Sequence, residues 1–301
     1  MPFAVRAPFD WRLRTQTLSL GPQTLIMGIL NVTPDSFSDG GQFFDANASL
    51  KHALEMLGDG ADILDLGGES TRPNAVPITP AEELTRVIPV LKAILAARPT
   101  AVISIDTYHS ETARIAIESG AEIVNDVSGH LWDPVMSSTC AELACGTILM
   151  HTRGRPHEWS TLPRLAPSEI LPLILRDLET RAATALAAGI AHDSIVLDPG
   201  FGFGKIMGEN YPLLAGLDVL QALGFPILAG VSRKSFLTRA ITQAGTPGPA
   251  TETWDPSHQL PTAVANTAAI LAGAHILRVH DVAPAHQTAV IADRILAAAK
   301  S

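Results

Sequence analysis

Short apolar runs recur along the chain, and a polar residue or loop follows each of them. The runs are largely apolar rather than alternating, which is typical of parallel β-strands that are buried on both faces. We therefore expect one strand in each run. The eight predicted strands are Thr24–Leu30, Ile63–Leu66, Val102–Ile105, Ile123–Asn125, Thr147–Met150, Ile195–Leu197, Ile227–Ala229 and Ile276–Val279.

Segments rich in Ala and Leu, with apolar residues at helical spacing, separate these strands. Eight alternations of strand and helix predict an α/β fold, a (β/α)8 TIM barrel. Because such barrels routinely occupy about 250 residues as one domain, we expect a single domain over residues 1–301, with the barrel from about residue 24 to residue 300. The predicted helices are Ala48–Leu57, Pro80–Ala97, Ser110–Glu118, Pro134–Ala144, Pro167–Ala188, Asn210–Leu223, Ala263–Ala272 and His286–Ala299.

Two segments lie outside this repeat. Residues 1–23 form an N-terminal extension, in which Phe9-Asp10-Trp11 and Thr15-Gln16-Thr17-Leu18 alternate weakly between apolar and polar. This pattern predicts a short hairpin-like element that plugs the bottom of the barrel. The segment Gly245–Ser257, rich in Thr, Pro and Gly, predicts a surface loop before the eighth strand.

The chain is 47% hydrophobic and 17% charged, with a formal net charge of −9. This composition indicates a compact protein, and the negative charge argues against nucleic acid and anionic membranes as partners. The longest apolar stretch, Ala268–Leu277, is too short to cross a bilayer, and the first residues lack a signal-peptide apolar region. We therefore expect a cytoplasmic protein. Cys140 and Cys145 fit neither a disulfide framework nor a zinc-site spacing.

The active site of a TIM barrel lies at the carboxyl ends of its strands. A polar residue there often only caps the next helix, but many such residues together favour a shared site. In strand order they are Asn31; Glu69-Ser70-Thr71-Arg72; Asp106; Asn125-Asp126; His151; Asp198; Ser232-Arg233-Lys234-Ser235; and Arg278 with His280.

One subset of these residues suits the edge of a flat heterocycle. Asp106, Asn125, Asp198 and Lys234 offer hydrogen-bond acceptors and donors without forming a metal cage. A carboxylate that faces an amino group and a ring N–H makes paired hydrogen bonds, which give orientation and selectivity. Alternatively, the two acids are salt-bridged core residues. The basic strand-end residues that could pair with them are Lys205, Lys234, Arg72 and Arg278.

A second subset is cationic and polar in an otherwise acidic chain. Arg72, Arg278 and His280, with Asn31, predict a phosphate site, because the last loops of this fold recurrently bind phosphate and arginine forks onto its oxygens. The two subsets imply a division of labour. Replacement of Arg278 by Ala is then expected to lower turnover and leave affinity for the heterocycle nearly intact.

The glycine-rich run Asp198-Pro199-Gly200-Phe201-Gly202-Phe203-Gly204-Lys205 lacks the spacing of a nucleotide-binding loop. Its glycines allow close backbone approach, and Phe203 offers an aromatic wall for a flat ligand, although simple loop packing would also explain this residue. After the fifth strand, Arg153 and Arg155 could reach over the site or be solvated loop charges.

Seven motifs in this order are similar to those of the dihydropteroate synthase family. Together they span residues 25 to 282 and are highly specific. They are Asn31-Val32-Thr33-Pro34-Asp35-Ser36-Phe37-Ser38-Asp39-Gly40-Gly41, Asp65-Leu66-Gly67-Gly68-Glu69-Ser70-Thr71-Arg72-Pro73, Ser104-Ile105-Asp106-Thr107, Val124-Asn125-Asp126-Val127-Ser128-Gly129, the glycine-rich run, Ser232-Arg233-Lys234-Ser235-Phe236 and Arg278-Val279-His280-Asp281-Val282.

The resemblance implies a transferase of folate biosynthesis that joins 6-hydroxymethyl-7,8-dihydropterin pyrophosphate to 4-aminobenzoate. It implies a homodimer, a sulfonamide target, and Mg²⁺ that accompanies the pyrophosphate beside Asn31. The pterin would contact Asp106, Asn125, Asp198 and Lys234, and the phosphates Asn31, Arg72, Arg278 and His280. The aminobenzoate would contact Thr71, Pro73, Phe203, Lys234 and Ser235. Mobile loops at residues 31–41, including Asp35, Ser36 and Phe37, and at 67–77, including Ser70, would close over the site.

Two other functions compete with this interpretation. A pterin-binding methyltransferase would share the heterocycle pocket, but it would leave the cationic and aromatic residues without an obvious task. A folate-binding or regulatory paralogue would keep the pocket without catalysis. The apolar helical face at Ala289–Ala298 could serve a homodimer or simply cover the barrel.

Overall fold

The computed structural model describes residues 3, 5–32, 46–69, 76–243 and 259–299. All eight predicted strands are present, and neighbouring strands are parallel, in the order β8-β7-β6-β5-β4-β3-β10-β9. A parallel bridge between Leu197 and Ile227 joins the two ends of this order and closes the barrel. The strands are β3 (Leu25–Asn31), β4 (Ile63–Gly67), β5 (Val102–Asp106), β6 (Ile123–Asp126), β7 (Gly146–Met150), β8 (Ile195–Asp198), β9 (Leu228–Ala229) and β10 (Ile276–Val279).

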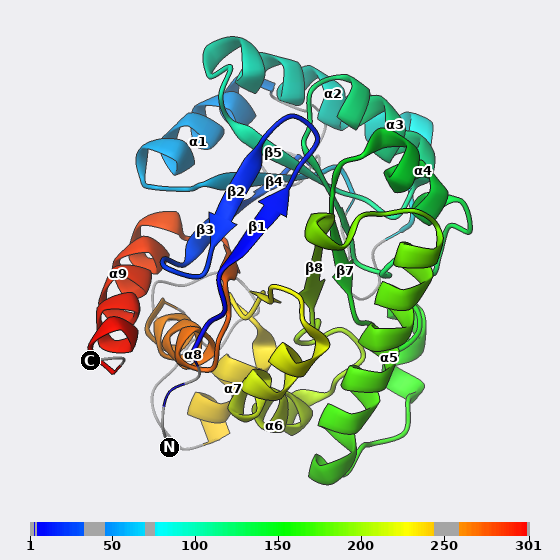
Figure 1. Ribbon diagram of the computed structural model, residues 1–301. Coiled ribbons are helices and arrows are strands. Elements are labelled where there is room, and N and C mark those ends of the chain that lie inside the picture. Colours follow the sequence, from blue (N-terminus) through cyan, green and yellow to red (C-terminus); the bar gives the residue numbers. More distant parts are fainter. Residues whose placement is uncertain (1–2, 4, 33–45, 70–75, 244–258, 300–301) are drawn as a thin grey trace.

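Helices surround the barrel, so the fold is the predicted (β/α)8 TIM barrel (Figure 1). Their apolar faces pack on the outward-facing residues of the strands in one large core, which explains why the strand sequences are apolar on both faces. The described helices are α1 (Ala46–Gly58), α2 (Pro80–Ala97), α3 (Ser110–Glu118), α4 (Met136–Leu143), α5 (Pro167–Ala187), α6 (Asn210–Ala215), α7 (Ser235–Gln243), α8 (Gln259–Leu271) and α9 (Val282–Ala298).

The helical segment after β8 differs from its prediction. The sequence predicts one helix over Asn210–Leu223, but α6 ends at Ala215 and a 3-10 helix continues over Leu217–Leu223. Gly216 separates the two, where a Cβ would lie 2.4 Å from the side chain of Leu171 on α5. The close approach of α5 therefore requires glycine at the position where the α-helix stops. Helix α7, directly after the strand-end lysine, was not predicted.

The N-terminal hairpin fills the bottom of the barrel, as predicted. Strands β1 (Phe9–Arg12) and β2 (Thr17–Leu20) pair antiparallel and lie across the barrel's end (Figure 1). Trp11, Leu13 and Leu20 are buried there against residues near the start of each barrel strand, and the Trp11 indole N–H donates to the Ser194 carbonyl at 3.0 Å. This end is closed by apolar packing, so the carboxyl ends of the strands remain for a ligand.

The predicted surface loop at Gly245–Ser257 lies outside the described residues. Within the described ranges, no helix combines the length and the apolar character that a bilayer crossing requires.

Candidate active site

An arginine on the last strand organises the acids at the carboxyl end of the barrel. Arg278 on β10 donates from Nε to Asp65 Oδ2 and from Nη2 to Asp106 Oδ2, both at 2.6 Å. Asn125 on β6 donates from Nδ2 to the same Asp65 oxygen at 2.9 Å. Because β4, β5 and β6 are neighbours and β10 lies beyond β3, the network ties together four of the eight barrel strands.

Asp65 is the functional residue that the strand-end pattern misses. It lies inside β4, two residues before the end of the strand, and its side chain is fully buried. A carboxylate within an apolar run is a usable signal, because a buried charge needs a partner. The sequence contains that signal in Ile63-Leu64-Asp65-Leu66. One oxygen, Oδ1, has no hydrogen-bond partner among the described residues.

Asp106 ends β5 and keeps 11% of its side chain exposed. Burial raises the pKa of this carboxyl to about 7; the Arg278 guanidinium opposes the rise, and the nearby acids, led by Asp65, add to it. The alternative prediction, that the two acids are salt-bridged, is confirmed for Asp106, because Asp106 pairs with Arg278. Its carboxyl nevertheless sits at the rim with a pKa near neutrality, where it can gain or lose a proton as a ligand arrives.

Asp198 and Lys234 form the other side of the site. Asp198 ends β8, is buried, and accepts the Gly200 N–H on Oδ1 at 2.7 Å. Burial raises the pKa of Asp198, while the Gly200 hydrogen bond, Lys234 and Arg278 oppose that rise. Lys234 lies in the segment between β9 and α7. Burial, with Arg278, lowers the pKa of Lys234 to about 8, against the pull of Asp198 and Asp106.

The glycine-rich run after β8 is held rigidly by a lysine. Lys205 is buried and donates from Nζ to the carbonyls of His151, Gly200 and Phe203 at 3.1, 2.7 and 3.2 Å. Gly200 has a φ of +68°, and a Cβ there would lie 1.9 Å from the His151 carbonyl oxygen. The sequence predicts that these glycines allow a close backbone approach. At Gly200, the backbone that comes close is the end of β7. Lys205 serves the loop, and Phe203 projects from it toward Lys234, whose Nζ is 4.1 Å from the ring centroid.

Two of the predicted phosphate residues are at the same rim. Asn31 is the last residue of β3 and half-buried; a Cβ on Gly67 would face both the Asn31 amide oxygen and Asp106, at 3.8 and 3.7 Å. His280 follows β10, with Nδ1 3.1 Å from Ser232 Oγ, which also accepts the His280 backbone N–H. Arg278, also predicted as a phosphate contact, is hydrogen-bonded to Asp65 and Asp106.

Ser235, predicted in the aminobenzoate pocket, is the first residue of α7, next to Lys234, and is exposed. The remaining predicted positions fall outside the described residues: Asp35, Ser36, Phe37, Ser70, Thr71, Arg72 and Pro73.

Three strand-end groups support the fold rather than the rim. Asp126 accepts backbone N–H groups of the loop that follows β6, which is the capping role that any strand-end acid can have. His151 is fully buried with Nε2 3.3 Å from Asp177, and burial lowers its pKa to about 3, so it stays neutral. Glu69 accepts a hydrogen bond from the Tyr108 hydroxyl at 2.8 Å.

A magnesium site rests on few groups in the described part of the chain. No cluster of three or more His, Cys, Asp or Glu side chains occurs among those residues. Mg²⁺ usually keeps several waters and takes one or two protein oxygens together with substrate phosphates. The Asn31 amide oxygen at the rim fits that limited role, so the donor set agrees with a metal that a diphosphate would carry in.

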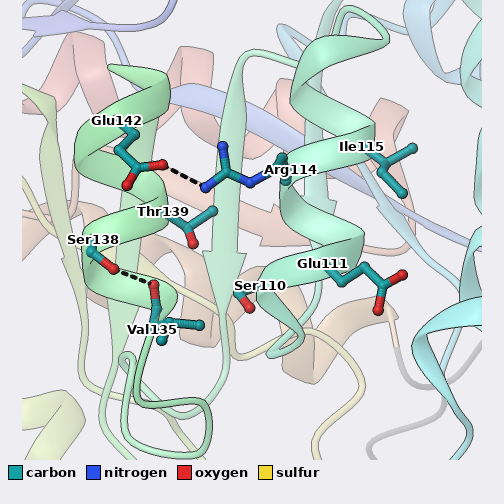
Figure 2. Close-up of a pocket in the computed structure, with 8 residues that line it drawn as sticks. All are labelled: Ser110, Glu111, Arg114, Ile115, Val135, Ser138, Thr139 and Glu142. Atoms are coloured by element: carbon teal, nitrogen blue, oxygen red, sulfur yellow. Dashed lines mark hydrogen bonds and ion pairs between the residues drawn. The ribbon is translucent and has the colours of Figure 1, made fainter.

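A separate groove lies on the flank of the barrel between α3 and α4 (Figure 2). Its volume is about 480 Å³, but its polar groups satisfy one another: Arg114 pairs with Glu142 at 2.6 Å, and Ser138 donates to the Val135 carbonyl. It contains none of the strand-end groups. We therefore place the chemistry at the barrel rim.

The sequence matches the family model of pterin binding enzymes over residues 27–280. The dihydropteroate synthase of Mycobacterium leprae is 44% identical over 271 residues, which cover 88% of this chain and 90% of that protein. The enzyme of Synechocystis is 39% identical over 287 residues, covering 95% of this chain and 92% of the relative.

Solved structures agree. The dihydropteroate synthase of Clostridium difficile, determined in the presence of pteroic acid, is 38% identical and superposes with a TM-score of 0.82, over 92% of this chain and 98% of that one. The Xanthomonas albilineans enzyme with 4-aminobenzoic acid is 36% identical, with a TM-score of 0.80 over 97% and 99%. The Yersinia pestis enzyme in a sulfonamide complex is 36% identical, with a TM-score of 0.84 over 96% and 100%.

Proposed function

This chain belongs to the pterin binding enzyme family, and we propose that it acts as a dihydropteroate synthase. It condenses 6-hydroxymethyl-7,8-dihydropterin pyrophosphate with 4-aminobenzoate and gives 7,8-dihydropteroate and pyrophosphate. The observation that carries the proposal is the network of Arg278, Asp65, Asp106 and Asn125 at the strand ends, in a chain that matches dihydropteroate synthases over most of its length.

The pterin is recognised by its aminopyrimidinone edge. Its exocyclic amino group and ring N–H lie side by side, and a carboxylate can accept both in parallel hydrogen bonds. Asp198 supplies such a carboxylate, with Asp106 and Asn125 along the ring and Lys234 donating to an acceptor on it. A buried, preformed acid rejects a ligand that lacks these N–H groups, because the carboxylate would be left unpaired.

The reaction needs charge stabilisation more than proton transfer. The C–O bond to pyrophosphate breaks with its electron pair on the leaving oxygen; the aromatic amine, already uncharged at pH 7, then attacks the pterin-stabilised cation and its proton goes to solvent. Mg²⁺ bound beside Asn31 would supply positive charge at the diphosphate. Arg72, Arg278 and His280 bind the diphosphate and stabilise its charge as it leaves.

The aminobenzoate lies against Phe203, with Lys234 and Ser235 beside it, and Thr71 and Pro73 are its remaining contacts. The half-buried Phe203 ring offers a flat apolar surface to the benzoate ring, and Lys234 and the exposed Ser235 offer donors to its polar groups. We also place the enzyme in the cytoplasm, which agrees with the two buried free cysteines.

The proposed function is tested with purified protein, the pterin pyrophosphate and Mg²⁺, with and without 4-aminobenzoate. We expect 7,8-dihydropteroate, identified by mass, and pyrophosphate in equal amounts only when both substrates are present. Tight pterin binding without condensation would instead favour the methyltransferase or the non-catalytic paralogue. A protein with Asp198→Asn serves as the control for activity from contaminants.

Pterin binding should weaken as the pH rises through about 8, the pKa to which burial and Arg278 lower Lys234. The ammonium makes a charge-assisted hydrogen bond to the pterin, and above that pH the neutral amine offers only a weaker, uncharged donor. Lys234→Arg keeps its proton throughout, so its affinity should stay flat between pH 7 and 9 even if it is weaker overall. Calorimetric titration across this range measures both. An equal decline in the arginine variant would assign the titration to another group.

We further propose that the enzyme is a homodimer that uses α8 and α9. These helices pack together, and three of their apolar side chains are exposed among the described residues: Leu260 is 74% exposed, Val264 63% and Ile291 61%. Large exposed apolar side chains on two packed helices are typical of an interface.

Sedimentation should therefore give twice the 31.8 kDa mass of one chain. Ile291→Glu should yield a folded monomer, because a charge would be buried unpaired in the interface. Val135→Glu, which changes an exposed valine on another flank, should leave the dimer intact. A monomeric wild type at micromolar concentration would refute the proposal.

A further inference from the structure

The segment between β7 and α5 has no role in the function as described so far. It contains a 3-10 helix over Pro156–Thr161 in which Trp159 is 9% exposed. The indole N–H of Trp159 donates to the Gly154 carbonyl at 3.3 Å. Arg153 ties the same segment to the glycine-rich run by donating to the Gly204 carbonyl at 3.0 Å. The segment is thus tied to the glycine-rich run, and Arg153 is held by the carbonyls of Gly204 and Pro163.

Trp159 reaches the proposed aminobenzoate site through one contact. Its ring meets that of Phe203 edge to face, with centroids 5.4 Å apart and planes at 87°. This geometry is the favoured one for aromatic pairs. The Phe203 backbone is held separately, because its N–H donates to the Gly200 carbonyl and its own carbonyl accepts Lys205 Nζ. What remains to be fixed is the direction of the Phe203 side chain, and Trp159 is in contact with that ring.

Phe203 in turn determines the surroundings of Lys234. The Lys234 ammonium lies 4.1 Å from the Phe203 ring centroid, which is a cation–π contact. The charged groups that act on this ammonium are Arg278, which repels it, and Asp198 and Asp106, which attract it; Lys205 is a further cation nearby. The ammonium therefore contacts the ring face, and this contact competes with its attraction to the two carboxylates that are proposed to bind pterin.

We propose that Trp159 is a positioning residue that acts through Phe203: it fixes the ring that forms the aminobenzoate wall and holds the Lys234 ammonium over the ring face. The inference rests on the proposed function and adds a residue to it. Without the Trp159 edge, Phe203 turns away, the aminobenzoate loses its wall, and Lys234 moves toward the carboxylates and competes with the pterin.

A double-mutant cycle tests this coupling, with kcat and KM for 4-aminobenzoate measured for wild type, Trp159→Leu, Phe203→Leu and the double variant. An edge-to-face contact corresponds to about a fivefold effect, so we expect Trp159→Leu to lower kcat/KM about fivefold, mainly through KM. In the Phe203→Leu background the same change should cost less than about twofold, because its target is already gone.

Two further variants separate positioning from general damage. Trp159→Phe keeps an aromatic edge and should recover most of the activity. Trp132→Leu removes a tryptophan whose ring contacts Tyr108 and Arg155 instead, and should leave KM unchanged. Closer contact with Asp198 and Asp106 favours the protonated lysine, so Trp159→Leu should also move the alkaline limb of kcat/KM to higher pH, which Trp132→Leu should not do.

An equal loss from Trp159→Leu in both backgrounds would overturn the inference, and so would an unshifted alkaline limb. Thermal unfolding of every variant is recorded alongside; if Trp159→Leu does not fold, Trp159→Met, which also lacks the aromatic edge, and its combination with Phe203→Leu supply the same cycle. Absence of product from the wild type would reject the proposed function itself, which is a different result from additive effects in an active enzyme.

Discussion

The paired hydrogen bonds from Arg278 to Asp65 and Asp106 are the interaction on which the site depends. Two acids that lie close together beneath the rim repel each other, and burial makes that repulsion costly. One guanidinium fork between them offsets the repulsion and fixes both carboxylates in place. The guanidinium must reach both carboxylates, and the curved sheet makes this possible because β10 is separated from β4 by β3 alone. The hairpin closes the other end with apolar side chains, so the charges collect at one face.

In this arrangement, two ionisable groups of the site have pKa values close to neutral pH. Burial raises the pKa of Asp106 to about 7 and lowers that of Lys234 to about 8. Both groups therefore change protonation readily when a ligand alters their surroundings, as is common where a protein holds polar groups for binding rather than for stability. Burying such groups weakens the fold, and the surrounding apolar core and the tied glycine-rich run compensate for it.

Much of the fold could be predicted because its pattern is local. Uninterrupted apolar runs identify strands, and glycines and prolines separate the elements; the misjudged helix after β8 depends on Leu171, which contacts Gly216 from a distant part of the chain. The site could be predicted as a set of residues but not as a set of pairs. Which strand-end residue meets which depends on the stagger of the strands. The sequence predicts Arg278 both as a phosphate contact and as one of four possible partners of the acids, and only the structure shows that it pairs with Asp65 and Asp106. Asp65 is absent from the predicted site because it precedes the strand end.

We propose that Arg278 aligns the carboxylates that bind the pterin, in addition to any contact that it makes with phosphate. The most direct measurement is calorimetric affinity of wild type and Arg278→Met for 6-hydroxymethylpterin, which carries no phosphate, with the free energy of unfolding at pH 7 and pH 5. We predict at least about tenfold weaker binding, because the carboxylates lose their alignment, and a loss of stability of about 3–5 kcal/mol at pH 7 from the unpaired acids. The loss should be smaller at pH 5, where Asp106, its pKa raised further without Arg278, is protonated. Unchanged affinity for this phosphate-free ligand would show that Arg278 does not align the carboxylates and binds only the anion.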